Sequence, residues 1–273
     1  MAAIELQNLS FRIGKADIVK DVSFSVEDGE LFVLCGSSGA GKTTLLRLIT
    51  GEWQPQSGDI FLDGRSLLGI PMQKRGTVLV SQGNDLFPHM TVFENAAFAL
   101  RARRVPRPEI KGRLEELARR FRLVQHMHRY PHELSGGQQK LAAILRAVAV
   151  EPGVLLLDEP FTGLDRNLHT EIRDFLLEFQ RERRLTVLMI THSKEDAFFM
   201  GNHIGFLFDG RLLRCAGVWE LYEKTGDARI DSFLGELVAL PDGRRVFADK
   251  ILPKGTDDIL ISLQGGNTKH ENC

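Results

Sequence analysis

The N-terminal part of the chain alternates apolar and polar residues with the period of a half-exposed strand. This alternation covers residues 4–9 and returns over residues 22–26. Residues 59–62 form another short strand-like segment with a Gly-containing turn on each side. Because an antiparallel sheet can expose one face to water, the pattern predicts antiparallel strands in this region.

A second pattern consists of short runs that are apolar throughout, at residues 31–35, 154–157 and 187–190. Residues 77–81 have an apolar centre between Thr77 and Ser81 and also predict a buried strand. Strands of a parallel sheet that is covered on both faces have this character. Residues 204–208 continue the pattern, and Asp209-Gly210 then predicts a hairpin into a strand over residues 211–215.

Helical periodicity and capping signals lie between these runs. Thr91 and Glu94 have the spacing of a capping box, which predicts a helix that continues to Leu100. Gly51 is a plausible C-cap for the helix that follows residues 31–35. Further helices are expected over about 109–121, 135–148, 167–183 and 194–200.

Composition narrows the class of protein. The chain has 35 Lys and Arg against 36 Asp and Glu, so no basic bias points to nucleic acid. Cys35, Cys215 and Cys273 are too far apart for a disulfide framework or a metal motif, which fits a reducing cytosol. No apolar run has the length of a bilayer span, and the N-terminus lacks the features of a signal peptide. We therefore expect any membrane role to depend on partners.

The segment Gly36 to Thr43, GSSGAGKT, carries the strongest chemical signal. Its glycines let backbone N–H groups close around phosphate oxygens, and a helix N-terminus adds partial positive charge. Lys42 supplies a point charge for the β- and γ-phosphates, and the Thr43 hydroxyl suits Mg²⁺. The strand before this P-loop and the helix after it favour nucleotide binding over an ordinary glycine-rich turn.

These elements together predict an α/β fold. We expect a P-loop NTPase core sheet with an antiparallel β annex and a helical subdomain inserted at about 85–134. This domain is expected to cover residues 1–234. Residues 235–273 predict a short β-rich C-terminal extension, with strands near 237–240 and 259–263 and a disordered end.

Two adjacent carboxylates, Asp158 and Glu159, follow the apolar run at 154–157. Ligands of open α/β sheets bind at the carboxyl ends of the strands. Asp158 is placed to anchor Mg²⁺ through its water shell, and Glu159 to orient or deprotonate a water that attacks the γ-phosphate. The alternative is an ordinary polar turn, which the upstream P-loop disfavours.

A second glycine-rich helix start, Leu134-Ser135-Gly136-Gly137-Gln138, precedes these carboxylates. Its N–H groups and dipole again favour an anion. Since the P-loop already provides a phosphate site, this segment is predicted to complete a site on another subunit. The alternative is an N-capped helix after a glycine turn.

In their order along the chain, these motifs resemble the nucleotide-binding subunit of an ATP-binding cassette (ABC) transporter. The resemblance extends from about residue 3 to residue 234, and it includes Gln82, Leu164-Asp165 and His192. It implies an ATPase that closes around two MgATP, either as a homodimer or paired with a similar subunit.

The resemblance also assigns roles to residues of this chain. It implies that the nucleotide is held by Gly36, Ser37, Ser38, Gly39, Ala40, Gly41, Lys42, Thr43 and Thr44. It implies catalysis by Lys42, Gln82, Glu159 and His192, and Mg²⁺ contacts from Thr43, Gln82 and Asp158. The nucleotide of the partner subunit would be covered by Ser135, Gly136, Gly137 and Gln138, with Asp165 acting across the dimer.

One part of the family pattern is absent. The family usually has an aromatic residue near position 13 that stacks on adenine, whereas this chain has Ile13. Phe11 lies two residues earlier and would share a face with Ile13 on a regular strand. The sequence leaves open whether Phe11 or Ile13 contacts adenine or whether Phe11 belongs to the core.

The segment 86–95 resembles the equivalent segment in the ATPase subunits of bacterial uptake systems for inorganic anions, iron or polyamines. In those systems the region forms a groove for a short helix of the membrane subunit, and Phe87, Met90 and Phe93 suit such a groove. The resemblance implies transmembrane permease subunits, an external solute-binding protein, no nucleic-acid partner, and a peripheral location on the cytoplasmic face of the inner or plasma membrane.

Two alternatives belong to other classes of protein. A soluble ABC ATPase acting on nucleic acid or ribosomes predicts long coiled-coil inserts or two cassettes in one chain, and this sequence has neither. The ATPase of an exporter remains open, because the membrane partner sets the direction of transport. The transported solute cannot be read from this subunit.

Overall fold

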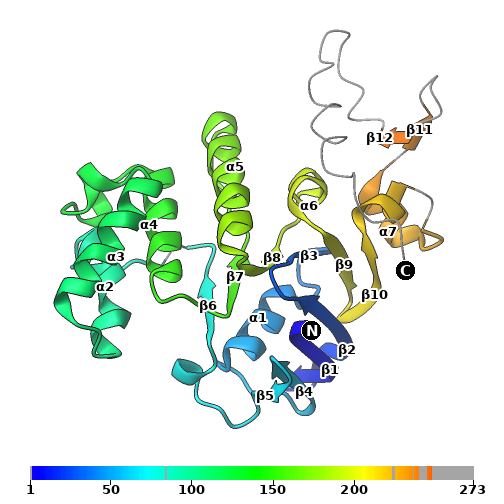
Figure 1. Ribbon diagram of the computed structural model, residues 1–273. Coiled ribbons are helices and arrows are strands. Elements are labelled where there is room, and N and C mark those ends of the chain that lie inside the picture. The colour runs from blue at the N-terminus through cyan, green and yellow to red at the C-terminus, as the bar shows by residue number, and fades with distance from the viewer. Residues whose placement is uncertain (1, 84, 223–224, 236, 240–244, 248–273) are drawn as a thin grey trace, which may run out of the picture. The chain divides into compact units, whose positions relative to one another are not determined.

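The computed structural model describes residues 2–83, 85–222, 225–235, 237–239 and 245–247 (Figure 1). The chain divides into two compact units, Met1–Val218 and Trp219–Cys273. This division falls inside the domain predicted for residues 1–234. Each unit is described by itself below.

The first unit contains an antiparallel sheet of four strands in the order β2-β1-β4-β5. Its strands are β1 (Ala2–Ile13), β2 (Ala16–Glu27), β4 (Ser57–Leu62) and β5 (Arg65–Ser66). The predicted antiparallel annex is therefore confirmed, although β1 and β2 are longer than the alternating segments. Irregularities interrupt the register of β1 with β2, so alternation alone does not define the strand ends.

The core sheet has six strands in the order β10-β9-β3-β8-β7-β6, and all neighbouring pairs are parallel except β9 with β10. Its strands are β3 (Leu31–Cys35), β6 (Thr77–Val80), β7 (Val154–Asp158), β8 (Thr186–Ile190), β9 (His203–Phe208) and β10 (Arg211–Gly217). Every residue of β3, β7 and β8 is buried, as their apolar runs predict. Strand β6 is buried only at its two ends, because it forms the edge of the sheet.

Helices complete the core around this sheet. The chain forms α1 (Lys42–Thr50), α5 (Arg166–Arg183) and α6 (Lys194–Met200) between its strands. Helix α1 contributes Leu45, Leu46, Leu48 and Ile49 to one hydrophobic cluster with residues of both sheets. The antiparallel annex is thereby packed against the strand that leads into the P-loop. Gly51 caps the C-terminus of α1 in the left-handed conformation, as predicted.

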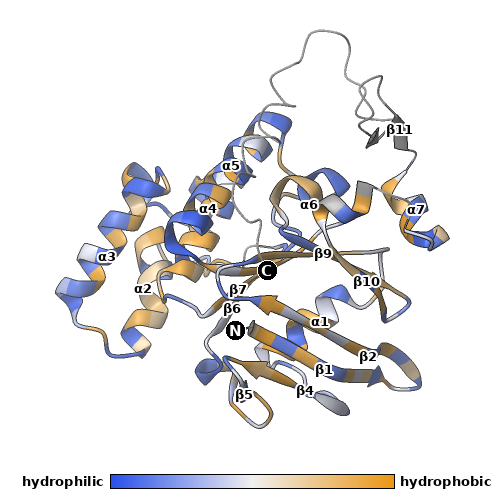
Figure 2. Cartoon of the chain, turned by 45° about the vertical axis from the view of Figure 1, so that its right-hand side comes forward, coloured by the Kyte–Doolittle hydropathy of each residue, from blue (hydrophilic) through white to orange (hydrophobic). Residues whose placement is uncertain are grey.

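The inserted helices are α2 (Val92–Ala102), α3 (Arg107–Arg120) and α4 (Gly136–Val148), and they gather beside β6 (Figure 1). Short 3₁₀ turns lie at Met72–Lys74, Val124–His126 and Pro131–Glu133. The capping box of Thr91 and Glu94 is present at α2, as predicted. Helix α3 buries Ile110, Leu114, Leu117 and Ala118, and the rest of it is largely hydrophilic (Figure 2).

The second unit is described over fewer residues. A 3₁₀ turn at Val218–Tyr222 begins at the last residue of the first unit and continues into the second. The second unit also contains α7 (Ala228–Leu234), whose N-cap is Asp227. Strands β11 (Leu237–Ala239) and β12 (Arg245–Phe247) pair antiparallel, in agreement with the predicted strand near 237–240. The predicted strand at 259–263 and the predicted disordered end lie outside the described residues.

Candidate active site

The predicted site residues follow strands that end at the same edge of the core sheet. Leu34 of β3 lies beside Ile190 of β8, and Ile190 lies beside Asp158 of β7. Val80 near the end of β6 lies beside Leu157 of β7. Because these neighbours are parallel, the segments that follow them emerge together at the carboxyl edge, where open α/β sheets bind their ligands.

A pocket of about 310 Å³ opens at this edge. It brings together the four residues predicted to act in catalysis, which are Lys42, Gln82, Glu159 and His192. The remaining lining residues are Ile18, Ser38, Gly39, Gly41, Thr43, Thr44, Asp158 and Ile190. The pocket thus combines a glycine loop, a lysine, three hydroxyl side chains and two carboxylates.

The conformation of the loop before α1 requires glycine at two positions. A Cβ on Gly36 would lie 1.9 Å from the carbonyl oxygen of Leu207, and a Cβ on Gly41 would lie 2.7 Å from that of Ile18. Gly41 also has a positive φ of 100°. The loop delivers the N-terminus of α1 to the pocket, where the first helical N–H groups have no partner within the helix.

The Lys42 side chain is buried beneath this loop. Its Nζ donates hydrogen bonds of 2.9 Å to the carbonyl oxygens of Gly36 and Ser37. Burial lowers the pKa of the ammonium, whereas the nearby Glu159, Cys35 and Asp158 raise it. A phosphate in the pocket would offer this cation stronger, charged acceptors than the two carbonyls.

Asp158 and Thr43 place oxygen atoms next to one another. Burial of Asp158 raises the pKa of its carboxyl group, and a hydrogen bond from the Thr43 side chain opposes that shift. Within the part of the chain that the structure describes, no cluster of three or more His, Cys, Asp and Glu side chains forms a complete metal site. A hard cation would therefore need oxygen ligands from a bound phosphate or from water, as is usual for Mg²⁺.

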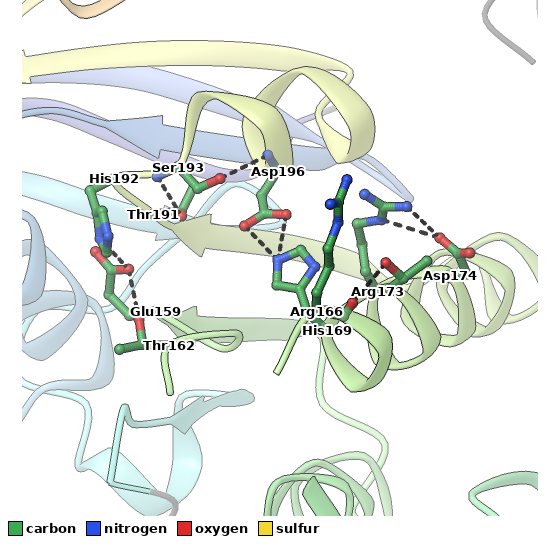
Figure 3. A network of polar contacts seen from close by, with 11 residues as sticks. Glu159, Thr162, Arg166, His169, Arg173, Asp174, Thr191, His192, Ser193 and Asp196 are labelled. Carbon is green, nitrogen blue, oxygen red and sulfur yellow. Dashed lines mark hydrogen bonds and ion pairs between the residues drawn. The ribbon is translucent and has the colours of Figure 1, made fainter. Parts of the chain in front are cut away.

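Glu159 is held by a backbone and a side-chain contact. Its φ is 49°, in the left-handed region, and its N–H donates to the carbonyl oxygen of Ile190 at 3.0 Å. Its Oε2 lies 2.7 Å from Nδ1 of His192, and Thr162 Oγ1 donates to the same oxygen at 3.3 Å (Figure 3). The carboxylate is thus oriented from both sides, while most of the His192 side chain is exposed.

A second polar network connects the segment that follows His192 with α5. His169 of α5 lies 2.9 Å from the buried Oδ1 of Asp196, and Ser193 caps α6 by accepting the Asp196 N–H (Figure 3). Asp165 caps α5 by accepting the N–H groups of Asn167 and Leu168. The sequence analysis did not identify the pair His169 and Asp196, because nothing in their spacing shows that two helices bring them together.

The segment Ser135–Gln138 opens α4 as predicted, with a capping box formed by Ser135 and Gln138. The Gln138 amide also approaches Nε2 of the buried His126 at 3.2 Å. Among the described residues, none of Ser135, Gly136, Gly137, Gln138 and Asp165 lines the pocket. The glycine-rich start of α4 therefore does not contribute to the phosphate pocket of its own chain.

The structure gives Phe11 a neighbour that the sequence did not reveal. Its ring stacks on Trp53, with centroids 5.2 Å apart, and it packs against the hydrophobic core. Ile13 is 50% exposed, and neither residue lines the pocket. Ile18 of β2 lines it instead. A shift in strand register between Phe11 and Arg12 breaks the regular alternation on which the expectation of a shared face depended.

The segment around residues 86–95, predicted to form a groove for a partner, is a loop that leads into α2, and its backbone is held by side-chain hydrogen bonds. Phe87, Met90 and Phe93 are partly exposed, as is the Phe98 ring, whose centroid lies 4.9 Å from that of Phe87. The buried Asn95 side chain fixes this loop through hydrogen bonds to Phe87, Met90 and Thr91. These contacts hold apolar side chains at the surface without help from another subunit.

Comparison with known proteins identifies relatives of this chain. A sequence model of the ABC transporter family matches residues 19–162. A molybdate/tungstate import ATP-binding protein of Thermococcus kodakarensis is 42% identical over 80% of this chain and 66% of its own length. A sulfate/thiosulfate import ATP-binding protein of Gloeobacter violaceus is 39% identical over 97% of this chain and 78% of its own. A spermidine/putrescine import ATP-binding protein of Aggregatibacter actinomycetemcomitans is 37% identical, with 95% and 68% covered.

The chain thus spans about two-thirds of the length of the first of these relatives. Among solved structures, cbiO1 of Clostridium perfringens matches with a TM-score of 0.73 and 26% identity over 81% of this chain and 90% of its own. A bacterial ABC transporter cassette solved as a dimer matches with a TM-score of 0.71 and 28% identity, with 79% and 98% covered. Among the described residues of the present chain, no helix is both long enough and apolar enough to cross a membrane.

Proposed function

Because this chain belongs to the ABC transporter family and is one of its ATPases, we propose that it powers solute uptake as one of two cassettes that close around two MgATP. The observation that carries the proposal is the pocket, in which the P-loop faces Glu159 and His192. The glycine-rich start of α4 lies outside that pocket and is free to act on a second subunit. Neither feature alone would support a dimeric ATPase.

ATP binding depends on the loop and on the first turn of α1. The N–H groups of Gly39, Gly41 and Lys42 cradle the phosphates, and the dipole of α1 favours their negative charge. The Lys42 ammonium leaves the carbonyls of Gly36 and Ser37 for the β- and γ-phosphates. Burial of this cation makes the exchange favourable, because negatively charged phosphate oxygens replace neutral carbonyl oxygens as its acceptors.

The oxygen atoms of Thr43, Asp158 and Gln82 are the groups that would hold Mg²⁺ in this pocket. The bound ion would supply positive charge between the phosphates and these side chains. The hydrogen bond from Thr43 to Asp158 already places two of the oxygen donors together. Gln82 approaches from the end of β6 and thereby connects the pocket to the inserted helical subdomain.

Glu159 is the general base in this proposal. Its carboxylate is fixed by His192 and Thr162, so it can orient a water and take a proton from it as the water attacks the γ-phosphate. His192 has a second ring nitrogen that is available to the γ-phosphate. The contact between the two residues makes the orientation of each depend on the other.

Closure of the dimer supplies what one chain lacks. Ser135, Gly136, Gly137 and Gln138 would cover the nucleotide of the partner, and Asp165 would contact the partner near the same place. ATP then favours the closed state because only that state makes both sets of phosphate contacts. Hydrolysis removes the γ-phosphate between the two surfaces and releases the dimer.

Three relatives are named as import proteins for molybdate or tungstate, sulfate or thiosulfate, and spermidine or putrescine. These solutes are all small and charged, and we infer that the solute of this system belongs to the same chemical class. The loop around Phe87 and Phe98 would receive a short helix of a transmembrane permease, and a solute-binding protein would deliver the solute. The chain would then sit peripherally on the cytoplasmic face of the membrane.

The dimer proposal is tested with Glu159→Gln, which keeps the shape of the side chain but removes the base. In the presence of ATP and Mg²⁺ this variant should elute as a dimer and return to a monomer when ATP is removed, measured by size-exclusion chromatography with light scattering. A matched control adds Lys42→Ala, which should abolish the ATP-dependent dimer. A monomer at saturating ATP, together with wild-type turnover that is independent of protein concentration, would refute the proposal.

A further inference from the structure

Lys140 is one of the largest fully buried side chains of the described chain, with a relative exposure of 2%. It lies on α4, two residues after Gln138. A lysine at a site this dry is unusual, because its charge is costly to remove from water unless it has a partner. An apolar side chain would fill the same space without that cost. The buried ammonium of Lys140 therefore needs a specific polar contact to compensate for the loss of water.

The contact of Lys140 is with the wall of the nucleotide pocket. Its Nζ donates to the main-chain carbonyl oxygen of Gln82 at 3.3 Å. Burial lowers the pKa of this ammonium, whereas the carboxylates of Asp158 and Asp85 raise it, so both acids lie near enough to interact with its charge. Gln82 and Asp158 line the pocket, but Lys140 does not. The lysine therefore lies behind the pocket, where it touches the backbone that carries Gln82.

A second cation of α4 holds the same segment further along. Arg146 donates to the main-chain carbonyl oxygen of Asp85 at 2.5 Å, and its guanidinium lies 5.6 Å from the centroid of the Phe87 ring. Asp85 in turn accepts a hydrogen bond from Ser81. The chain beyond β6 is thus fastened to α4 at two carbonyls, those of Gln82 and Asp85.

We propose that Lys140 is a positioning residue for ATP hydrolysis, which holds the backbone of Gln82 so that the position of its side chain in the pocket follows helix α4. This inference rests on the proposed function, in which Gln82 acts at the γ-phosphate end of the site and α4 acts on the partner. Loss of the hydrogen bond from Lys140 to the Gln82 carbonyl should therefore let the Gln82 side chain leave its position in the pocket, while the P-loop and Lys42 stay in place.

The test compares two neutral replacements in the full chain. Lys140→Met fills the buried space but donates no hydrogen bond, whereas Lys140→Gln can still donate its amide N–H to the Gln82 carbonyl. We expect Lys140→Met to lower kcat for ATP about tenfold and Lys140→Gln to restore most of that loss. The dissociation constant of a fluorescent, non-hydrolysable ATP analogue should change less than twofold in both. Lys111→Met, at a lysine whose side chain is 72% exposed, is the matched control and should turn over as wild type does.

A double mutant separates positioning from a merely structural role. In a Gln82→Ala background, Lys140→Met should cost little further kcat, because the group that it positions is already gone. If Lys140→Met is too unstable to assay, Lys140→Leu, which also donates no hydrogen bond, takes its place alone and in the Gln82→Ala background.

Three results would overturn the inference: unchanged kcat in Lys140→Met, a Lys140→Gln variant as slow as Lys140→Met, or costs that multiply fully in the double mutant. Failure of the proposed function would look different, because the wild-type chain itself would then show no ATP-dependent dimer.

Discussion

Nδ1 of His192 lies 2.7 Å from Oε2 of Glu159, so the loop after β8 and the loop after β7 meet at a single carboxylate oxygen. The two residues are 33 positions apart in the sequence, yet the parallel pairing of Asp158 with Ile190 sets their strands side by side. Thr162 donates to the same oxygen at 3.3 Å, which makes Glu159 Oε2 the shared acceptor of a strong and a weak contact.

This geometry predicts unequal effects for the two donors. His192→Ala should lower kcat by about a hundredfold, the low end of the effect of disabling an acid–base group, because it removes the side chain that orients the Glu159 base. Thr162→Ala should lower it by less than about tenfold, since the hydrogen bond from its hydroxyl to the carboxylate is long, at 3.3 Å, and contributes about 1 kcal/mol. Steady-state ATPase assays at saturating MgATP provide the measurement. Equal losses in the two variants would contradict the ranking.

The positions of these site residues could be predicted because each follows a strand that its apolar run made recognisable. The strand expected at 187–190 is observed as Thr186–Ile190, and the helix expected at 194–200 coincides with α6. Parallel strands that end at one edge bring their following residues together, so motif order was enough to place Lys42, Glu159 and His192 in one pocket.

Contacts that depend on the exact path of the chain could not be predicted. Ile18 enters the pocket because the antiparallel sheet folds against the P-loop, and Phe11 turns to Trp53 because strand register shifts nearby. Neither event leaves a periodic signal. The left-handed backbone of Glu159 is likewise set by its bond to Ile190, which is distant in the sequence.

Asp158 should make the apo protein less stable than it could be. Burial is the main cause of the raised pKa of Asp158. At any pH above the pKa of the folded state, the buried charged carboxylate therefore lowers the free energy of unfolding. This loss of stability disappears below the pKa of the unfolded chain, where the carboxyl group is protonated in both states. Asp158→Asn should therefore raise the free energy of unfolding at pH 7 by on the order of 1 kcal/mol. The same variant should lose Mg²⁺-dependent turnover.

Urea denaturation without nucleotide at pH 7 and near pH 3.5 measures this effect, and the advantage of Asp158→Asn should shrink at the lower pH. Asp174→Asn is a suitable control because the Asp174 side chain, in the middle of α5, is 53% exposed. A stability gain in the control equal to that of Asp158→Asn would show that burial of the Asp158 carboxylate is not the cause.

His126 should make the protein sensitive to acid. Its side chain is buried, and burial followed by the charge of Arg129 lowers its pKa. Nδ1 has no hydrogen-bond partner, while Nε2 faces the amides of Gln138 and Gln125. The unfolded chain therefore binds a proton more readily than the folded one, and stability falls as the pH drops below about 6.5, the ordinary value for His.

Replacement with an apolar residue should remove that dependence. Between pH 7.5 and pH 5, the wild type should lose more of its free energy of unfolding than His126→Leu does, because only the wild-type unfolded chain takes up a proton on His126 as the pH falls through about 6.5. The matched control is His128→Leu, since His128 is exposed two residues away. Parallel pH profiles for wild type and His126→Leu would contradict the prediction.

Gly137 has an intramolecular reason to be glycine, besides any contact with a partner nucleotide. A Cβ at this position would lie 2.2 Å from Cδ2 of Leu168 and 2.8 Å from its Cγ, whereas a Cβ on Gly136 would meet no atom within 4 Å. Leu168 stands in the first turn of α5, and its N–H is capped by Asp165. The start of α4 and the start of α5 are therefore packed together within one chain.

Gly137→Ala should accordingly destabilise the monomer by about 1 kcal/mol, the low end of the cost of overpacking, because the clashing atoms are the end of the half-exposed Leu168 side chain, which can move aside. Gly136→Ala should have no such cost and gains a few tenths of a kcal/mol or more from the better helix propensity of alanine. Adding Leu168→Ala to Gly137→Ala should recover part of the lost stability, because the clashing atoms of the leucine are removed. In urea denaturation, the effects of the two substitutions on the free energy of unfolding should therefore be strongly non-additive. Additive losses would mean that the Leu168 side chain is not what disfavours a Cβ at position 137.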